Sequence, residues 1–173
     1  MATTYELIAK NILGSNAASI SFSSIPATYT DLLIVFSLRT NQASTSSNLK
    51  VTFNSNGTGY SRRSLQGDGS SAASYNGSSE AGILYIDING ANSTSSTFGS
   101  GGIYVPNYAG STNKSASVEY AWETNATAAG IGAIAALWAN TAAIDTVTLT
   151  EQNGNNLVTN SSAYLYRIRS NHE

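Results

Sequence analysis

The stretch DLLIVFSLRT, residues 31–40, decides the fold class. Every second residue in it is apolar, which is the period of a β-strand with one buried face. These residues are Leu32, Ile34, Phe36 and Leu38. Leu33 and Val35 begin a second apolar face before Ser37 turns it polar. The pattern predicts a central strand that is buried on both sides at one end.

Similar runs, rich in β-branched and aromatic residues, recur along the chain between clusters of Gly, Asn and Ser. We predict strands over residues 5–13, 19–22, 31–40, 48–53, 60–66, 82–88, 98–105, 115–123, 131–138, 144–150 and 162–169. Plain alternation in two of them directs five further side chains to the core: Val118, Tyr120, Trp122, Val147 and Leu149. Asn-Gly and Asp-Gly pairs between the runs supply the positive φ angles of hairpin turns.

Two segments are harder to interpret. The Ala-rich run AAGIGAIAALWAN, residues 128–140, also fits a helical stripe, but Gly130 and Gly132 and the surrounding β pattern favour a strand. Residues 67–79 are nearly all Gly, Ser, Ala and Asn, which predicts an exposed loop. The sequence therefore predicts an all-β protein: a single antiparallel β-sandwich of the jelly-roll type, with about ten strands in one domain over residues 1–173.

The composition excludes several classes of function. Charged residues are 10% of the chain, against about 25% in an average domain. More than a third of the residues are Ser, Thr or Asn. A net charge of −2 without clustered Lys or Arg argues against a nucleic-acid partner. With no cysteine, thiol catalysis and Cys-ligated metals are excluded. Glu6 interrupts any secretory apolar region, and no run approaches ~18 apolar residues, so we expect no membrane association.

Catalytic and metal-binding patterns are also missing. The single histidine, His172, is the penultimate residue, where chain ends are usually solvent-exposed. The acidic residues form no paired motif of a glycosidase or a metal site. We therefore expect no enzyme activity, no cofactor and no metal. A calcium site built from loop carbonyls with Asp68 or Asp87 stays open as an alternative.

Tyrosine is the residue type that suggests binding, because it combines a large contact area with a polar tip. Five of the ten tyrosines fall near predicted strand ends or in loops: Tyr29, Tyr60, Tyr75, Tyr104 and Tyr108. They could pack between subunits or serve as platforms for sugar rings. Arg62 and Arg63 form the one adjacent basic pair, which could be an edge-strand charge or reach an acidic group on another subunit. We select Tyr60, Arg62, Arg63 and Tyr104 as the interface candidates.

Several segments together resemble a known group of proteins. They are YELIAKNILGSNAASISFSSIPATYTDLLIVFSLRT, VTFNSNGTGYSRRSL, FGSGGIYVPNYAGSTNKS, LWANTAAIDTVTL and SSAYLYRI. The chain is similar to the small Ser/Asn-rich β proteins encoded among the virion genes of tailed bacteriophages, especially marine and cyanobacterial phages. The resemblance runs over nearly the whole length through an order of strands and not through a catalytic motif, so it assigns no site residue.

This resemblance implies a structural or accessory component of the virion, assembled in the host cytoplasm. The expected function is that of a capsid decoration, or cement, protein. It would work as a homo-oligomer, a homotrimer by expectation, bound to the major capsid protein or another virion protein. The alternative is a tail- or fibre-associated carbohydrate-binding module that recognises a surface glycan of the host.

Overall fold

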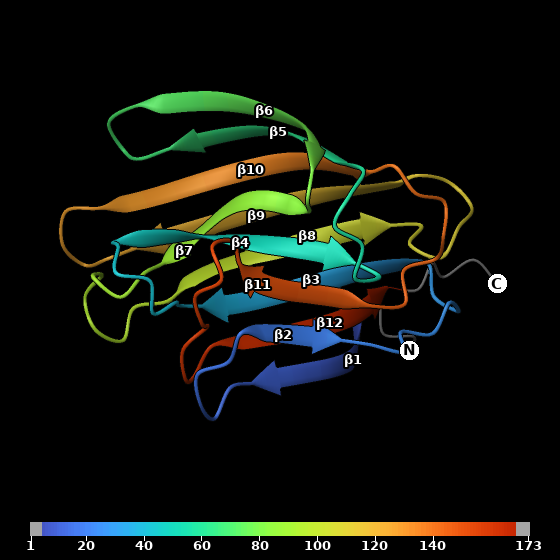
Figure 1. Ribbon diagram of the computed structural model, residues 1–173, viewed down its shortest axis with the longest axis horizontal. Helices are drawn as coiled ribbons and strands as arrows, with labels where there is room; N and C mark the ends of the chain where they lie inside the picture. Colours follow the sequence, from blue (N-terminus) through green and yellow to red (C-terminus); the bar gives the residue numbers. More distant parts are fainter. Residues whose placement is uncertain (1–4, 169–173) are drawn as a thin grey trace.

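The computed structural model describes residues 5–168, which form twelve β-strands and no helix (Figure 1). The strands are β1 (Tyr5–Ile12), β2 (Ser19–Phe22), β3 (Asp31–Leu38), β4 (Ser46–Phe53), β5 (Tyr60–Gly67), β6 (Ala72–Glu80), β7 (Ile83–Asn89), β8 (Gly99–Pro106), β9 (Lys114–Glu123), β10 (Ala129–Trp138), β11 (Val147–Glu151) and β12 (Ser162–Ile168). All pairs of neighbouring strands are antiparallel. The protein is an all-β sandwich, as the sequence predicts.

The strands form one large and one small sheet. The large sheet has the order β1-β12-β3-β8-β9-β10-β5-β6, and the small sheet has the order β2-β11-β4-β7. Eight strands pair in a nested way: β1 with β12, β2 with β11, β3 with β8, and β4 with β7. We call these eight strands the frame.

The other four strands are two hairpins inserted into the frame, and we call them the wing. The hairpin β5–β6 lies between β4 and β7 in the sequence, and β9–β10 lies between β8 and β11. The two hairpins meet where β10 pairs with β5, so they extend the large sheet beyond β8. In Figure 1 the wing occupies the upper part of the molecule, with β6 at its edge.

The core lies between the two sheets and includes side chains of the wing strands β9 and β10. Eight of the nine predicted core side chains are buried: Leu32, Ile34, Phe36, Leu38, Val118, Tyr120, Val147 and Leu149. Trp122 is the exception, because it is only half-buried near the end of β9. The β3 strand is central, as predicted, between β12 and β8. Its outer face is not buried, however, and Val35 is exposed, because the small sheet covers only the inner face.

An aromatic cluster joins the wing to the frame. Tyr60 of β5 stacks on Trp138 of β10, with ring centroids 5.9 Å apart and an interplanar angle of 14°. Phe53 of β4 packs against both rings. The Phe53 backbone N–H donates a hydrogen bond of 2.8 Å to the Tyr60 hydroxyl. Burial raises the pKa of Tyr60 to about 12, so this hydroxyl stays protonated at physiological pH.

The two ambiguous segments have different outcomes. The Ala-rich run is a strand, β10, as predicted. The prediction of a loop over residues 67–79 is wrong, because β6 occupies most of that segment. Its residues have low strand propensity, and the strand is held by backbone pairing with β5 at the sheet edge. A periodicity of side chains cannot reveal a strand whose two faces are both largely exposed.

Candidate functional site

The outer face of the large sheet is the most apolar exposed surface of the described chain. Ten large hydrophobic side chains are exposed in residues 5–168, and eight of them project from this face. They are Tyr5, Leu7, Ile12, Val35, Leu65, Tyr104, Ile131 and Leu137. Monomeric proteins rarely expose so much apolar surface in one place unless it binds something. This face is therefore one candidate interaction surface.

On the wing, this face consists of a ridge beside a hollow. The ridge is formed by Leu65 of β5 and Ile131 of β10, which are 60% and 66% exposed. The residues that pair alongside the ridge on the neighbouring strands β9 and β8 are mainly small. They include Ala121, Ser100 and Gly102. Small side chains leave space, and a hollow of about 720 Å³ lies over them. The outer face of the wing is therefore uneven, and the ridge and the hollow differ in height by about one side chain.

Two charged side chains of opposite sign line the outer face of the wing. Glu119 of β9 stands in the hollow, and Arg63 of β5 lines an adjoining hollow of about 450 Å³. Within residues 5–168 neither takes part in an ion pair, and Arg63 donates a hydrogen bond to the Arg62 carbonyl. Both charges therefore remain available to a partner.

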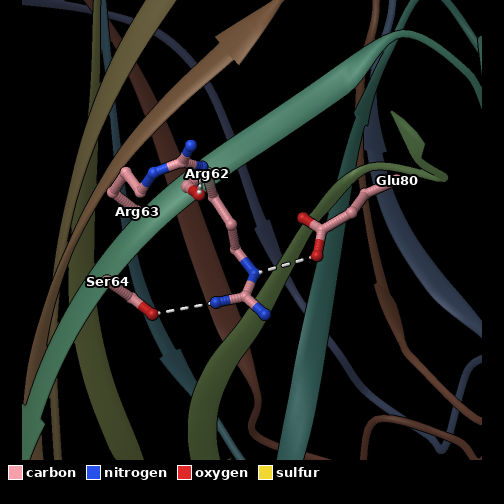
Figure 2. Close-up of polar contacts among 4 residues, drawn as sticks. All are labelled: Arg62, Arg63, Ser64 and Glu80. Carbon is pink, nitrogen blue, oxygen red and sulfur yellow. Dashed lines mark hydrogen bonds and ion pairs between the residues drawn. The ribbon is translucent and has the colours of Figure 1, made fainter. Parts of the chain in front are cut away.

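Two of the four predicted interface residues lie inside the protein. Tyr60 belongs to the aromatic cluster described above and is 1% exposed. Arg62 is 7% exposed; its Nε donates to Glu80 Oε1 at 3.1 Å and its Nη1 donates to Ser64 Oγ at 2.8 Å (Figure 2). Its guanidinium also lies 4.2 Å from the ring centroid of Tyr85 on β7. Tyr60 and Arg62 therefore bind the wing to the frame and do not offer a surface to another subunit.

The other two predicted interface residues are exposed on the outer face of the large sheet. Arg63 follows Arg62 on β5, and because successive residues of a strand point to opposite faces, it projects away from Glu80 (Figure 2). Tyr104 lies on β8 and donates a hydrogen bond of 2.9 Å from its hydroxyl to Asp31. That hydrogen bond raises the pKa of Tyr104. Both residues lie on strands, within the strand ranges that the sequence predicts.

The five tyrosines considered as sugar platforms have different environments. Tyr60 and Tyr108 are buried, and the Tyr108 hydroxyl donates to the Pro26 carbonyl. Tyr29 is partly buried under the guanidinium of Arg167. Tyr75 and Tyr104 are exposed, but on opposite faces of the large sheet. Tyr75 is on the inner face of β6, and Tyr104 is on the outer face of β8. A platform built from several of these tyrosines together is therefore ruled out.

A second candidate site is a cleft at the free end of the wing. It has a volume of about 160 Å³ and lies between the tip of the β5–β6 hairpin, strand β7 and the end of the β9–β10 hairpin. Its lining residues include Gln66, Asp68, Tyr75, Asp87 and Trp122. They come from five different strands or turns, so no local sequence motif connects them.

Glycines place the aromatic rings of this region. Gly130 lies directly opposite Trp122 in the β9–β10 register, and Gly132 lies opposite Tyr120. A Cβ atom at Gly130 would come within 2.4 Å of the Trp122 Nε1, and one at Gly132 within 2.3 Å of the Tyr120 ring. The missing side chains therefore let both rings lie flat across the neighbouring strand. The Gly-x-Gly spacing opposite two aromatics is a sequence signal for this arrangement that our prediction did not use.

The two carboxylates of the cleft have opposite pKa shifts. Burial raises the pKa of Asp87 to about 6, and the neighbouring Trp122 indole N–H partly offsets this effect. The Trp122 Nε1 atom is buried without a hydrogen bond of good geometry. The backbone N–H groups of Ser70 and Ser71 hydrogen-bond to Asp68 and hold its pKa well below the usual range. Asp68 therefore orders the hairpin tip, whereas Asp87 is left with unused acceptor capacity.

Within residues 5–168 no group of three or more His, Asp or Glu side chains is arranged to hold a metal ion. Asp68 and Asp87 do line the same cleft, but Asp68 already accepts four hydrogen bonds from Ser70 and Ser71 at Oδ1. The predicted lone histidine, His172, lies outside the described residues. The described residues also contain no helix long and apolar enough to cross a membrane.

Comparison with family models, with curated proteins and with solved structures finds no match to this chain. The function is therefore inferred from the two candidate sites and from the sequence resemblance.

Proposed function

We propose that this protein is a non-enzymatic structural protein of a phage virion, and more specifically a capsid decoration protein that works as a homo-oligomer on the head. The observation that carries the proposal is the apolar outer face of the large sheet, with its ridge and hollow on the wing. Such a face suits a protein that is permanently covered by other subunits. The resemblance to virion proteins supplies the context.

The ridge and the hollow are arranged so that two copies of the chain can pack together. They lie side by side on one face, so a two-fold axis between them brings the ridge of each copy into the hollow of the other. The same operation can set Arg63 of each copy near Glu119 of the other, because these residues lie on either side of β10. This packing gives an even number of copies, whereas the homotrimer expected from the sequence would require two separate surfaces on each protomer.

The topology is compatible with this role. We interpret the nested pairing of the frame strands as a jelly roll, the double Greek-key sandwich that many viral capsid domains and lectins use. The wing is then a pair of insertions that widens one sheet of the jelly roll. A wider sheet provides a larger outer face for contact with the shell or with another copy.

Sedimentation of the purified protein tests the self-association. We expect the natural chain to sediment as an oligomer, and Leu65→Asp combined with Ile131→Asp to sediment as a monomer, because each change buries an unpaired charge in the interface. Ser21→Asp adds one such charge to the exposed outer side of the small sheet and should leave the oligomer intact. A natural chain that is monomeric at all concentrations would contradict the proposed interface.

Deletion of the gene from its phage tests the role on the head. Particles without the protein should form heads of normal size that burst at a lower temperature, and the protein should be present in hundreds of copies per particle. If deletion leaves the heads stable but abolishes adsorption to host cells, the protein acts in host recognition. That result would support the alternative of a tail- or fibre-associated carbohydrate-binding module.

A further inference from the structure

The cleft at the free end of the wing lies on the other face of the large sheet from Leu65 of the ridge. Asp87 and Trp122 lie on the inner face, on the side of β7, whereas Leu65 projects from the outer face. The cleft and the outer hollow meet at the end of the wing, where they share three lining residues, one of them Ile131. The cleft adds polar and aromatic groups that the outer hollow lacks, so its role is tested separately from the proposed self-association.

The cleft is preformed. Its lower wall is the β9–β10 hairpin, in which Trp122 lies across Gly130. Its upper wall is the tip of β5–β6, which Asp68 holds by accepting backbone hydrogen bonds of 2.9 Å from Ser70 and 2.7 Å from Ser71. The Tyr120 hydroxyl donates to Gln66 at 3.4 Å and connects the two walls. A ligand would therefore bind without first ordering a loop, which improves affinity.

The lining indicates the kind of ligand. Tyr75, which is 50% exposed, and Trp122 provide aromatic surface. Asp87 and Gln66 provide hydrogen-bond acceptors, and the buried Trp122 N–H is a donor without a well-placed partner. No Lys or Arg of residues 5–168 lines the cleft, while two carboxylates do, so an anionic ligand is disfavoured. Aromatic surface together with acceptors for hydroxyl groups suits a neutral polyhydroxylated ring.

The volume limits the size of this ligand. Pockets for drug-sized ligands have volumes of about 300–1,000 Å³, so a cleft of about 160 Å³ suits a smaller ligand. That space accommodates one sugar ring and not a buried oligosaccharide. We propose that the cleft binds a single neutral sugar residue, with its ring against Tyr75 and Trp122 and its hydroxyl groups donating hydrogen bonds to Asp87.

Tryptophan fluorescence provides a direct measurement, because the chain has two tryptophans in different environments. Trp138 is buried against Tyr60, whereas Trp122 lines the cleft. We expect D-glucose, D-galactose, D-mannose or N-acetyl-D-glucosamine, titrated one at a time, to shift the emission with a Kd on the order of 1 mM. Trp122→Phe should abolish the shift, and isothermal titration calorimetry of the natural chain should give the same Kd.

Variants locate the site. Tyr75→Ala should weaken binding by about threefold to tenfold, and Asp87→Ala by at least about tenfold, since it removes a charged acceptor. Tyr104→Ala, an exposed tyrosine on the other face of the sheet, is the matched control and should bind as the natural chain does. Thermal melting followed by circular dichroism confirms that each variant is folded.

Three outcomes would overturn the proposal. One is that none of the four sugars changes the emission or releases heat at concentrations well above about 1 mM. Another is that binding survives in both Tyr75→Ala and Asp87→Ala, since the sugar would then bind elsewhere. The third is that D-glucuronate binds better than D-glucose, which would contradict the expected exclusion of anions. The oligomeric state is measured separately, so none of these outcomes bears on the proposed self-association.

Discussion

The large sheet has a different inner face in its frame strands and in the outer strands of the wing. In the frame, β3 places three apolar side chains, Leu32, Ile34 and Phe36, against the small sheet. In the wing, β5 begins with the buried Tyr60 and continues with the polar residues Arg62, Ser64 and Gln66 on the same face. A buried polar side chain is tolerated only where it finds partners or water. The wing thus contributes to the core through β9 and β10, whereas its β5–β6 hairpin presents polar groups beside the candidate cleft.

Two carboxylates of the frame differ in how their surroundings satisfy them. Burial alone would raise the pKa of Glu151 on β11, but hydrogen bonds from Asn155, Ser47 and Asn153 together lower it. Asp87 on β7, which lines the cleft between frame and wing, has no comparable set of donors, and burial raises its pKa to about 6. An acceptor is therefore left for a ligand where the frame meets the wing. Four predictions test how far the frame and the wing differ.

The largest effect is expected in the frame. Phe36→Ala removes a ring that is 2% exposed and packs over Gly101, so it should lower the free energy of unfolding by about 3–5 kcal/mol. Leu65→Ala on the wing should change it by less than about 0.5 kcal/mol in the monomer. Urea denaturation followed by circular dichroism measures both. Similar losses for the two variants would contradict the exposed position of Leu65.

The aromatic cluster should show whether the wing can open separately. Tyr60→Phe leaves the Phe53 N–H buried without its hydrogen-bond acceptor, which should cost about 1–3 kcal/mol. Hydrogen exchange should then accelerate more in β5 and β6 than in β3 and β12. Equal acceleration in all four strands would instead indicate that frame and wing unfold as one unit.

The carboxyl group of Asp87 should make stability depend on pH. Its pKa is about 6 in the folded chain against an ordinary value of 3.8, so ionisation between about pH 4 and pH 7 destabilises the folded state. Asp87→Asn has no carboxyl group to ionise, so its stability should not fall over this pH range. It should be more stable than the natural chain by about 1–2 kcal/mol at pH 8, and equally stable below pH 4. Thermal melts across that range provide the measurement, and a constant difference at all pH values would contradict the assigned shift.

The smallest effect concerns the charges on the outer face. Arg63→Glu or Glu119→Arg alone should weaken self-association by about 0.2–1 kcal/mol, since a like-charged pair replaces an attractive one. The double exchange should restore the affinity measured by sedimentation equilibrium. Additive losses in the double variant would show that these residues do not meet across the interface.

The sequence predicted most of the frame because alternation carries over directly to burial there. Every second residue from Leu32 to Leu38 in β3 faces the core, as the period of two requires. The same is true of Val147 and Leu149 in β11. The same period places the adjacent residues Arg62 and Arg63 on opposite faces of β5, as the structure shows. It could not predict that Tyr60 and Arg62 are buried, since alternation separates two faces but does not say which of them another sheet covers.

By itself, then, the sequence determined the β class, the inward side chains of the long strands and the absence of cysteine chemistry. Only the tertiary structure decided that β6 exists, because backbone pairing with β5 stabilises a strand of Ala, Ser, Asn and Gly. It also brought Tyr75, Asp87 and Trp122 to one cleft from three different strands. The physical reason is the same in both cases: strand pairing and packing depend on which segments become neighbours in space, and local residue patterns do not record that.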